Sequence, residues 1–112
     1  MSPAEVLHQA AVSVFREREL GVSLESARFL VVNSEYHDVT DDLRRRFVAR
    51  VIRGPEGAMG LKVIAEYQRR LELDDGTHWE PIDTDELRER ARGKELELGR
   101  AIERRFERWS ER

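Results

Sequence analysis

The sequence predicts an α+β fold: a three- to four-stranded antiparallel meander sheet with an N-terminal helix and a long C-terminal helix packed on one face. The sheet is predicted by two runs, residues 43–53 and 61–73, in which apolar and polar side chains alternate as in half-buried antiparallel strands. The helices are predicted by apolar side chains that recur at helical spacing near both ends of the chain. Because each pattern leaves one apolar side to cover, we expect the helices to pack on the sheet.

The N-terminal helix begins at a start signal. Ser2 suits the N-cap, Pro3 the first helical position, and Glu5 completes a capping box with Ser2. An apolar stripe then continues toward Leu20, and Gly21 is a natural C-terminal stop. We therefore expect a helix from Pro3 to about Leu20.

Three strands are expected in sequence order. Residues 28–36 are rich in β-forming side chains and predict a first strand, followed by a polar turn at residues 38–42. The two alternating runs then form a hairpin through a glycine-containing loop. Arg69 interrupts the apolar side of the second run, which predicts a bulge, a twist or a departure from the core there. Trp79, after a turn signal, begins a short extended return or packs on the sheet edge.

The C-terminal helix is expected to start at Asp83 or Thr84, either of which suits an N-cap, and to run to the carboxyl end. Gly93 and Gly99 each lower helix propensity by about 1 kcal/mol relative to alanine, so a kink or a close approach to the sheet is expected there. The predicted core takes apolar side chains from both helices and the hairpin: Val14, Phe15, Phe47, Val51, Val63, Tyr67, Ile102 and Phe106.

Size and composition limit the function. The 112 residues fit a single domain spanning the whole chain. The 20 basic and 23 acidic residues nearly cancel, so no overall charge attracts nucleic acid or anionic lipid, and nucleic acid is disfavoured as a partner. The absence of cysteine excludes disulfides and thiolate chemistry. No apolar run approaches the roughly 20 residues of a membrane-spanning helix, so we expect a soluble chain.

Residue types that perform catalysis are present but scattered. His8, His37 and His78 lack the spacing that aims two imidazoles at one metal ion. Asp74 and Asp75 are adjacent carboxylates, but a following glycine makes them a turn signal first. We therefore predict no catalytic residue, no metal and no cofactor, and a protein that is not an enzyme.

The polar side of the hairpin is the predicted interaction face. Strand alternation places on it Arg44, Arg46, Val48, Arg50, Ile52 and Ile64. The three aliphatic side chains form an apolar island that a helix or a protein partner would cover, and a homodimer through this face or through an exposed strand edge is an alternative. The arginines either pair across the strands with Glu66 and Glu72 or contact RNA phosphates. Because stacking aromatics are missing from this face, pairing is favoured.

Several segments resemble a known group of proteins. These are the run RRRFVARV at residues 44–51, the run GLKVIAEYQR at residues 60–69, the tripeptide WEP at residues 79–81, and the closing helix at residues 98–106. Together they resemble small bacterial envelope lipoprotein domains, in particular the soluble modules of outer-membrane assembly accessory lipoproteins. The resemblance spans residues 5–106. It implies a helix, a three-stranded sheet and a second helix, with no catalytic residues.

The leading hypothesis is therefore a non-enzymatic interaction or scaffold domain of the bacterial cell envelope, with a protein partner or a second copy. We expect it in the periplasm or at the outer-membrane periphery if a signal segment has been removed, and otherwise in the cytoplasm. A lipid anchor would also require residues before Met1. One alternative is a small RNA-binding module that uses the arginine-rich strand. Another is an enzyme or ligand-binding domain with a pocket between helix and sheet, lined by converging polar groups.

Overall fold

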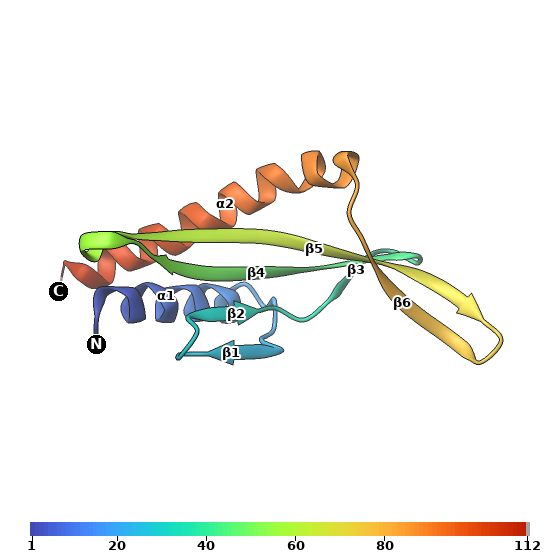
Figure 1. The fold of residues 1–112 in the computed structure, drawn as a ribbon, viewed down its shortest axis with the longest axis horizontal. Coiled ribbons are helices and arrows are strands. Elements are labelled where there is room, and N and C mark those ends of the chain that lie inside the picture. Colours follow the sequence, from blue (N-terminus) through green and yellow to red (C-terminus); the bar gives the residue numbers. More distant parts are fainter. Residues whose placement is uncertain (112) are drawn as a thin grey trace.

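The chain begins with a helix, continues through a series of strands and ends with a second helix (Figure 1). The computed structural model describes residues 1–111. In chain order the elements are α1 (Pro3–Glu17), β1 (Leu24–Ser26), β2 (Val31–Asn33), β3 (His37–Thr40), β4 (Leu43–Arg53), the 3-10 turn η1 (Pro55–Gly57), β5 (Met59–Leu73), β6 (Gly76–Ile82) and α2 (Asp85–Ser110). Neither helix in this part of the chain combines the length and the apolar character needed to cross a membrane.

All strand pairs are antiparallel, and the order across the sheet is β1-β2-β4-β5-β6, with β3 paired to the first part of β4. The β4–β5 ladder runs from the pair Leu43 and Arg69 to the pair Arg53 and Met59. From Tyr67 onward β5 also pairs with β6, and the ladder with β6 continues beyond Arg69, where the ladder with β4 ends. This two-stranded end of the sheet projects beyond both helices on the right of Figure 1. The predicted departure of the strand from the core near Arg69 is therefore confirmed.

The α+β class and the antiparallel sheet are confirmed, but the prediction of three to four strands is wrong, because the sheet has six. Residues 28–36 do not form one strand: a turn with Leu30 at φ 54° precedes β2, and β1 pairs back onto β2. Nor is the segment at 38–42 only a turn, because β3 pairs with β4 there. All four residues of β3 are exposed, so the strand carries no apolar alternation.

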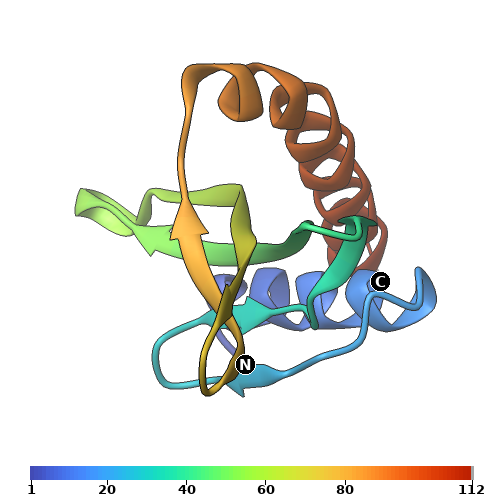
Figure 2. The same ribbon diagram turned by 90° about the vertical axis from the view of Figure 1, so that its right-hand side faces the viewer.

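The core lies between the helices and one face of the sheet, which we call the inner face. The inward side chains of β4 and β5 include Phe47, Ala49, Val51, Ala65 and Tyr67, all buried. Helix α1 lies against β2 and β4, and α2 lies along β5 and α1 (Figures 1 and 2). Of the eight predicted core residues, six are buried: Val14, Phe15, Phe47, Val51, Tyr67 and Ile102. Val63 and Phe106 are partly buried against the same cluster.

The predicted helix starts are confirmed. The Ser2 side chain accepts a hydrogen bond from the Glu5 N–H, and the Thr84 side chain accepts one from the Leu87 N–H. Helix α1 ends at Glu17, before the predicted Leu20. Helix α2 continues through both glycines, and a Cβ added to Gly99 would lie 3.7 Å from Val63 Cγ2. The predicted close approach of this helix to the sheet is therefore present at Gly99.

Candidate interaction face

The face of the sheet opposite the helices, which we call the outer face, carries all six residues of the predicted interaction face. Strand β4 contributes Arg44, Arg46, Val48, Arg50 and Ile52, which alternate with the inward residues. Ile64 of β5 is the register partner of Val48, so it points to the same side. The structure thus places the predicted set on one continuous surface, built by the central ladder of the sheet.

Three aliphatic side chains and one asparagine form a row across the middle of the outer face. The register aligns Leu24 of β1, Asn33 of β2, Val48 of β4 and Ile64 of β5 across four neighbouring strands. Val48 and Ile64 are half-buried, Leu24 is exposed, and Ile52 farther along β4 has 47% of its surface exposed. We call Leu24, Val48, Ile52 and Ile64 the apolar patch. No helix covers it within residues 1–111, since both helices pack on the inner face.

Two cations lie beside the apolar patch. Arg50 and Lys62 are direct register partners across β4 and β5, and both are exposed. Neither takes part in an ion pair with another of residues 1–111. Like charges that lie directly opposite each other destabilise a strand pair. The outer face therefore has an uncompensated positive site next to its apolar centre.

Arginine and aromatic side chains cluster at the other end of the outer face. The Arg44 guanidinium carbon lies 4.5 Å from the centre of the Tyr36 ring and 4.3 Å from the Trp79 ring. The Arg44 Nε donates a hydrogen bond of 2.7 Å to Gln68 Oε1, and Arg46 lies 4.9 Å from the Tyr36 ring. Cation–π contacts of this kind hold a guanidinium over a ring face. We call Tyr36, Arg44, Arg46 and Trp79 the aromatic cluster.

The aromatic cluster corrects the prediction that this side lacks stacking aromatics. Neither ring comes from the two central runs: Tyr36 lies in the segment between β2 and β3, and Trp79 lies in β6. The pairing of Trp79 with Arg70 brings the Trp79 ring to this face, and this strand register could not be predicted from the sequence. The aromatic side chains themselves were visible in the sequence, but the strand pairing that brings them to Arg44 was not.

The predicted pairing of the arginines is confirmed for one pair. Arg46 Nε donates to Glu66 Oε1 at 2.8 Å, across the β4–β5 ladder. Glu72 does not pair with β4, because its part of β5 lies beyond the end of that strand. It accepts instead from Arg70 Nε, and this hydrogen bond lowers the pKa of the Glu72 carboxyl.

A hollow of about 390 Å³ adjoins the aromatic cluster where the chain passes from β6 to α2. Its polar lining includes Arg46, Glu66, Asp83 and Arg88. Glu66 is paired with Arg46, and Arg88 Nε lies 2.8 Å from Asp83 Oδ1 as a charge contact without hydrogen-bond alignment. A guanidinium therefore lies beside each of these two carboxylates.

Each of the three histidines has its own polar partner. His8 is buried on α1 and its Nε2 lies 2.5 Å from Glu25 Oε1 on β1. His37 Nε2 contacts the Leu20 carbonyl oxygen and His78 Nε2 contacts Asp75 Oδ1, each at 2.8 Å. Within residues 1–111, no group of three or more His, Asp or Glu side chains could hold a metal ion.

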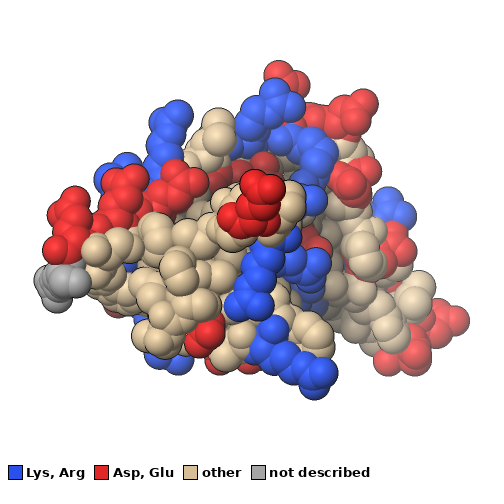
Figure 3. Space-filling view, turned by 60° about the vertical axis from the view of Figure 1, so that its left-hand side comes forward, with Lys and Arg blue, Asp and Glu red and all other residues tan. Residues whose placement is uncertain are grey.

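Charge on the surface is mixed in sign. Figure 3 shows Lys and Arg side chains interspersed with Asp and Glu on the side of the molecule that it presents. The chain matches no protein-family model, and a search of curated proteins finds no significant match.

Proposed function

We propose that this chain is a non-enzymatic interaction domain whose outer face binds a protein partner with an apolar centre and carboxylates at its rim. The observation that carries the proposal is the apolar patch lying next to the opposed cations Arg50 and Lys62. A partner would remove the aliphatic side chains from water and place carboxylates beside the two cations. An amphipathic helix is the partner element we favour, since helices already cover the inner face of this sheet.

Charge favours a different protein over a second copy as the partner. In a twofold dimer built on the apolar patch, the same surface is used on both copies. Arg50 and Lys62 of one copy would then lie close to Arg50 and Lys62 of the other copy, and these like charges would repel each other. Carboxylates on a different partner would instead attract them. Glu66, the register partner of Arg46 on the outer face, already forms an ion pair with Arg46.

The resemblance to envelope lipoprotein domains supports the bacterial cell envelope as the place where this interaction occurs. Fractionation of cells that express the protein from its own gene tests this part. We expect the protein in the periplasmic or outer-membrane fraction. Recovery in the cytoplasm alone would contradict the location and leave the interaction proposal standing.

The interaction is tested with a defined probe: a fluorescent amphipathic peptide of about 18 residues, or about five helical turns, with leucines on one side and glutamates on the other. We expect it to bind the full chain in a salt-sensitive manner, and a lysine version to bind more weakly. Ile52→Asp and Arg50→Glu should each weaken binding by about tenfold or more, equivalent to about 1.4 kcal/mol. Leu73→Asp is the matched control, because Leu73 is similarly exposed but lies at the far end of β5.

Three results would overturn the proposal. Equal binding of the lysine peptide would remove the charge argument. Sedimentation that shows a dimer dissociated by Ile52→Asp would make a second copy the partner. Binding of a single-stranded RNA at physiological salt, lost in Arg44→Ala, would assign the aromatic cluster to RNA and favour the RNA-binding alternative.

A further inference from the structure

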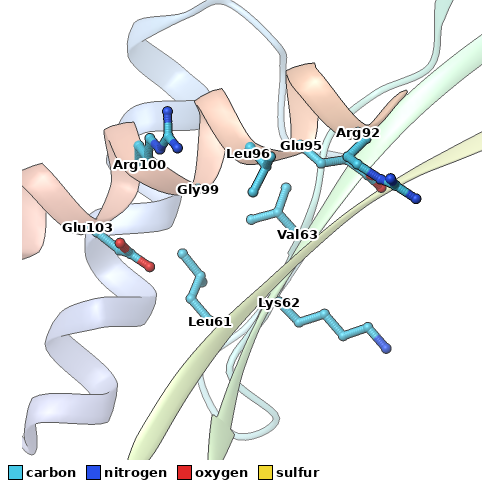
Figure 4. Close-up of a pocket in the computed structure, with 9 residues that line it drawn as sticks. All are labelled: Leu61, Lys62, Val63, Arg92, Glu95, Leu96, Gly99, Arg100 and Glu103. Carbon is cyan, nitrogen blue, oxygen red and sulfur yellow. The ribbon is translucent and has the colours of Figure 1, made fainter. Parts of the chain in front are cut away.

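A groove of about 420 Å³ runs between α2 and the edge of β5 that does not pair with β4 (Figure 4). Its strand wall is formed by Leu61 and Val63, and its helix wall includes Leu96 and Gly99. Strand β6 occupies the same edge of β5, but only from Tyr67 onward. The groove therefore continues the line of β6 along a stretch of β5 that has no neighbouring strand on that side within residues 1–111.

The backbone of β5 is open to hydrogen bonding in this groove. At Ala65 the N–H donates to Glu95 Oε2 at 2.8 Å, and the carbonyl oxygen accepts from Arg88, so both groups point away from β4. In a β-strand, alternate residues direct their N–H and C=O groups to the same edge. The corresponding groups of Val63 and Leu61 therefore point into the groove. Side chains of α2 form hydrogen bonds with the Ala65 N–H and C=O groups. The N–H and C=O groups of Val63 and Leu61 are available to pair with a further strand.

The inside of the groove is lined by apolar side chains. Gly99 has no side chain where α2 approaches β5, and an added Cβ there would already be in contact with Val63. Figure 4 shows Leu61, Val63 and Leu96 directed into the space between strand and helix. Leu96 has 55% of its surface exposed, although it lies on the side of α2 toward the sheet. These side chains give the groove an apolar floor.

The rim of the groove is positively charged. Lys62, Arg92 and Arg100 line it, and none of them forms an ion pair with another of residues 1–111. Glu95 also lines it but is engaged by the Ala65 N–H and by Arg88, which leaves Glu103 as the remaining acidic group. A segment with carboxylates between its apolar side chains would complement both floor and rim.

We infer that this groove binds an extended, acidic peptide segment of a partner protein, which adds a strand to the edge of β5 beside α2. The peptide would pair through its backbone with Leu61 and Val63, in line with β6. Its apolar side chains would contact Leu96 and the floor, and its carboxylates would contact Lys62, Arg92 and Arg100. Strand addition of this kind draws affinity from backbone hydrogen bonds and specificity from alternate side chains. This site uses none of the residues of the apolar patch, and it shares Lys62 with the outer face.

The inference is tested with a phage-displayed library of random peptides selected on the full chain, followed by anisotropy titrations of synthetic copies of the enriched sequences. We expect sequences in which apolar and acidic residues alternate. N-methylation of alternate backbone amides should reduce binding by about tenfold or more where those amides pair with β5, because each loses a donor. N-methylation of the intervening amides should leave binding nearly unchanged.

Gly99→Leu is the blocking variant, because its side chain would occupy the groove, and removing a helical glycine should not weaken α2. Gly93→Leu is the matched control, since a Cβ at Gly93 meets no atom within 4 Å. We expect peptide binding to fall by about tenfold or more in the first variant and to stay unchanged in the second.

The site would be rejected if no sequence were enriched, if N-methylation had no alternating effect, or if Gly99→Leu bound as well as Gly93→Leu. Unfolding curves of both variants show whether a loss of binding reflects a loss of fold. Enriched peptides that lose binding to Ile52→Asp instead would be ligands of the outer face and would also reject the groove. Failure here leaves the outer-face proposal intact, because that proposal is tested by Ile52→Asp and Arg50→Glu, and neither residue lines the groove.

Discussion

The inner and outer faces of the sheet are built from the same two strands but differ in what covers them. On β4, Phe47, Ala49 and Val51 are buried under the helices, whereas Val48 is half-buried and Ile52 is exposed. Both sets are apolar, so strand alternation alone does not explain which set forms the core. The difference lies in the charged neighbours of Val48 and Ile52 and in the apolar stripes of α1 and α2, which match the inner face. Apolar residues on the outer face are therefore available for a role other than folding.

Truncating an isoleucine in the core and one on the outer face should give the largest difference in the free energy of unfolding. Ile102 on α2 is fully buried, and Ile102→Ala should lower the free energy of unfolding by about 2–5 kcal/mol through lost burial and a cavity. Ile52→Ala removes the same atoms from an exposed site and should cost less than about 1 kcal/mol. Urea unfolding of both variants measures the difference. Equal losses would show that the outer face is covered in solution.

A buried hydroxyl on the edge of the core gives a smaller effect. Ser34 is fully buried; its Oγ accepts from the Phe47 N–H at 2.8 Å and donates to the Glu35 carbonyl oxygen at 2.9 Å. Ser34→Ala leaves a buried N–H without that partner, which should lower the free energy of unfolding by about 1–3 kcal/mol. Ser110→Ala, at the exposed end of α2, is the control and should change it by less than about 0.5 kcal/mol. A loss as small as that of the control would mean that water replaces the Ser34 hydroxyl.

The regular and local parts of this fold could be predicted from the sequence. The hairpin was marked by alternation over long runs, and the helix starts by capping residues such as Ser2 and Thr84, because these signals depend on near neighbours. The short strands β1 and β3 could not be predicted in the same way. Each has at most four residues and is largely exposed, so pairing with β2 or β4 leaves no apolar pattern.

The candidate site was predictable in composition but not in geometry. Alternation placed the six predicted residues on one side, and the structure agrees. The stacking of Arg44 between Tyr36 and Trp79 depends on how β6 and the segment before β3 fold back, which no local pattern specifies. The groove beside Val63 likewise depends on where β6 stops pairing with β5 and on the path of α2.

The outer face itself divides into two parts that should respond differently to loss of an arginine. Arg44 contacts two aromatic rings and Gln68, so Arg44→Ala should lower the free energy of unfolding by about 1–2 kcal/mol. Arg50 lies opposite Lys62 without an ion pair, and Arg50→Ala should change stability by no more than about 0.5 kcal/mol. Urea midpoints at equal slope measure both effects. A large loss for Arg50→Ala would indicate an intramolecular role and weaken its assignment to a partner.

The smallest expected effect concerns acid stability at the contact between the two helices. Arg105 hydrogen-bonds Glu17 and Arg18 hydrogen-bonds Glu97, and these contacts lower the pKa of both carboxyls from the usual 4.5. Because the folded-state pKa lies below the unfolded value, the pairs stabilise the fold above that value, and the contribution is lost as pH falls through the folded pKa. A double variant, Glu17→Gln with Glu97→Gln, should therefore show a shallower fall of the urea midpoint between about pH 7 and pH 3. Both carboxylates are exposed, so the change should be small and should diminish further in high salt. An unchanged slope would assign the acid sensitivity to other carboxylates.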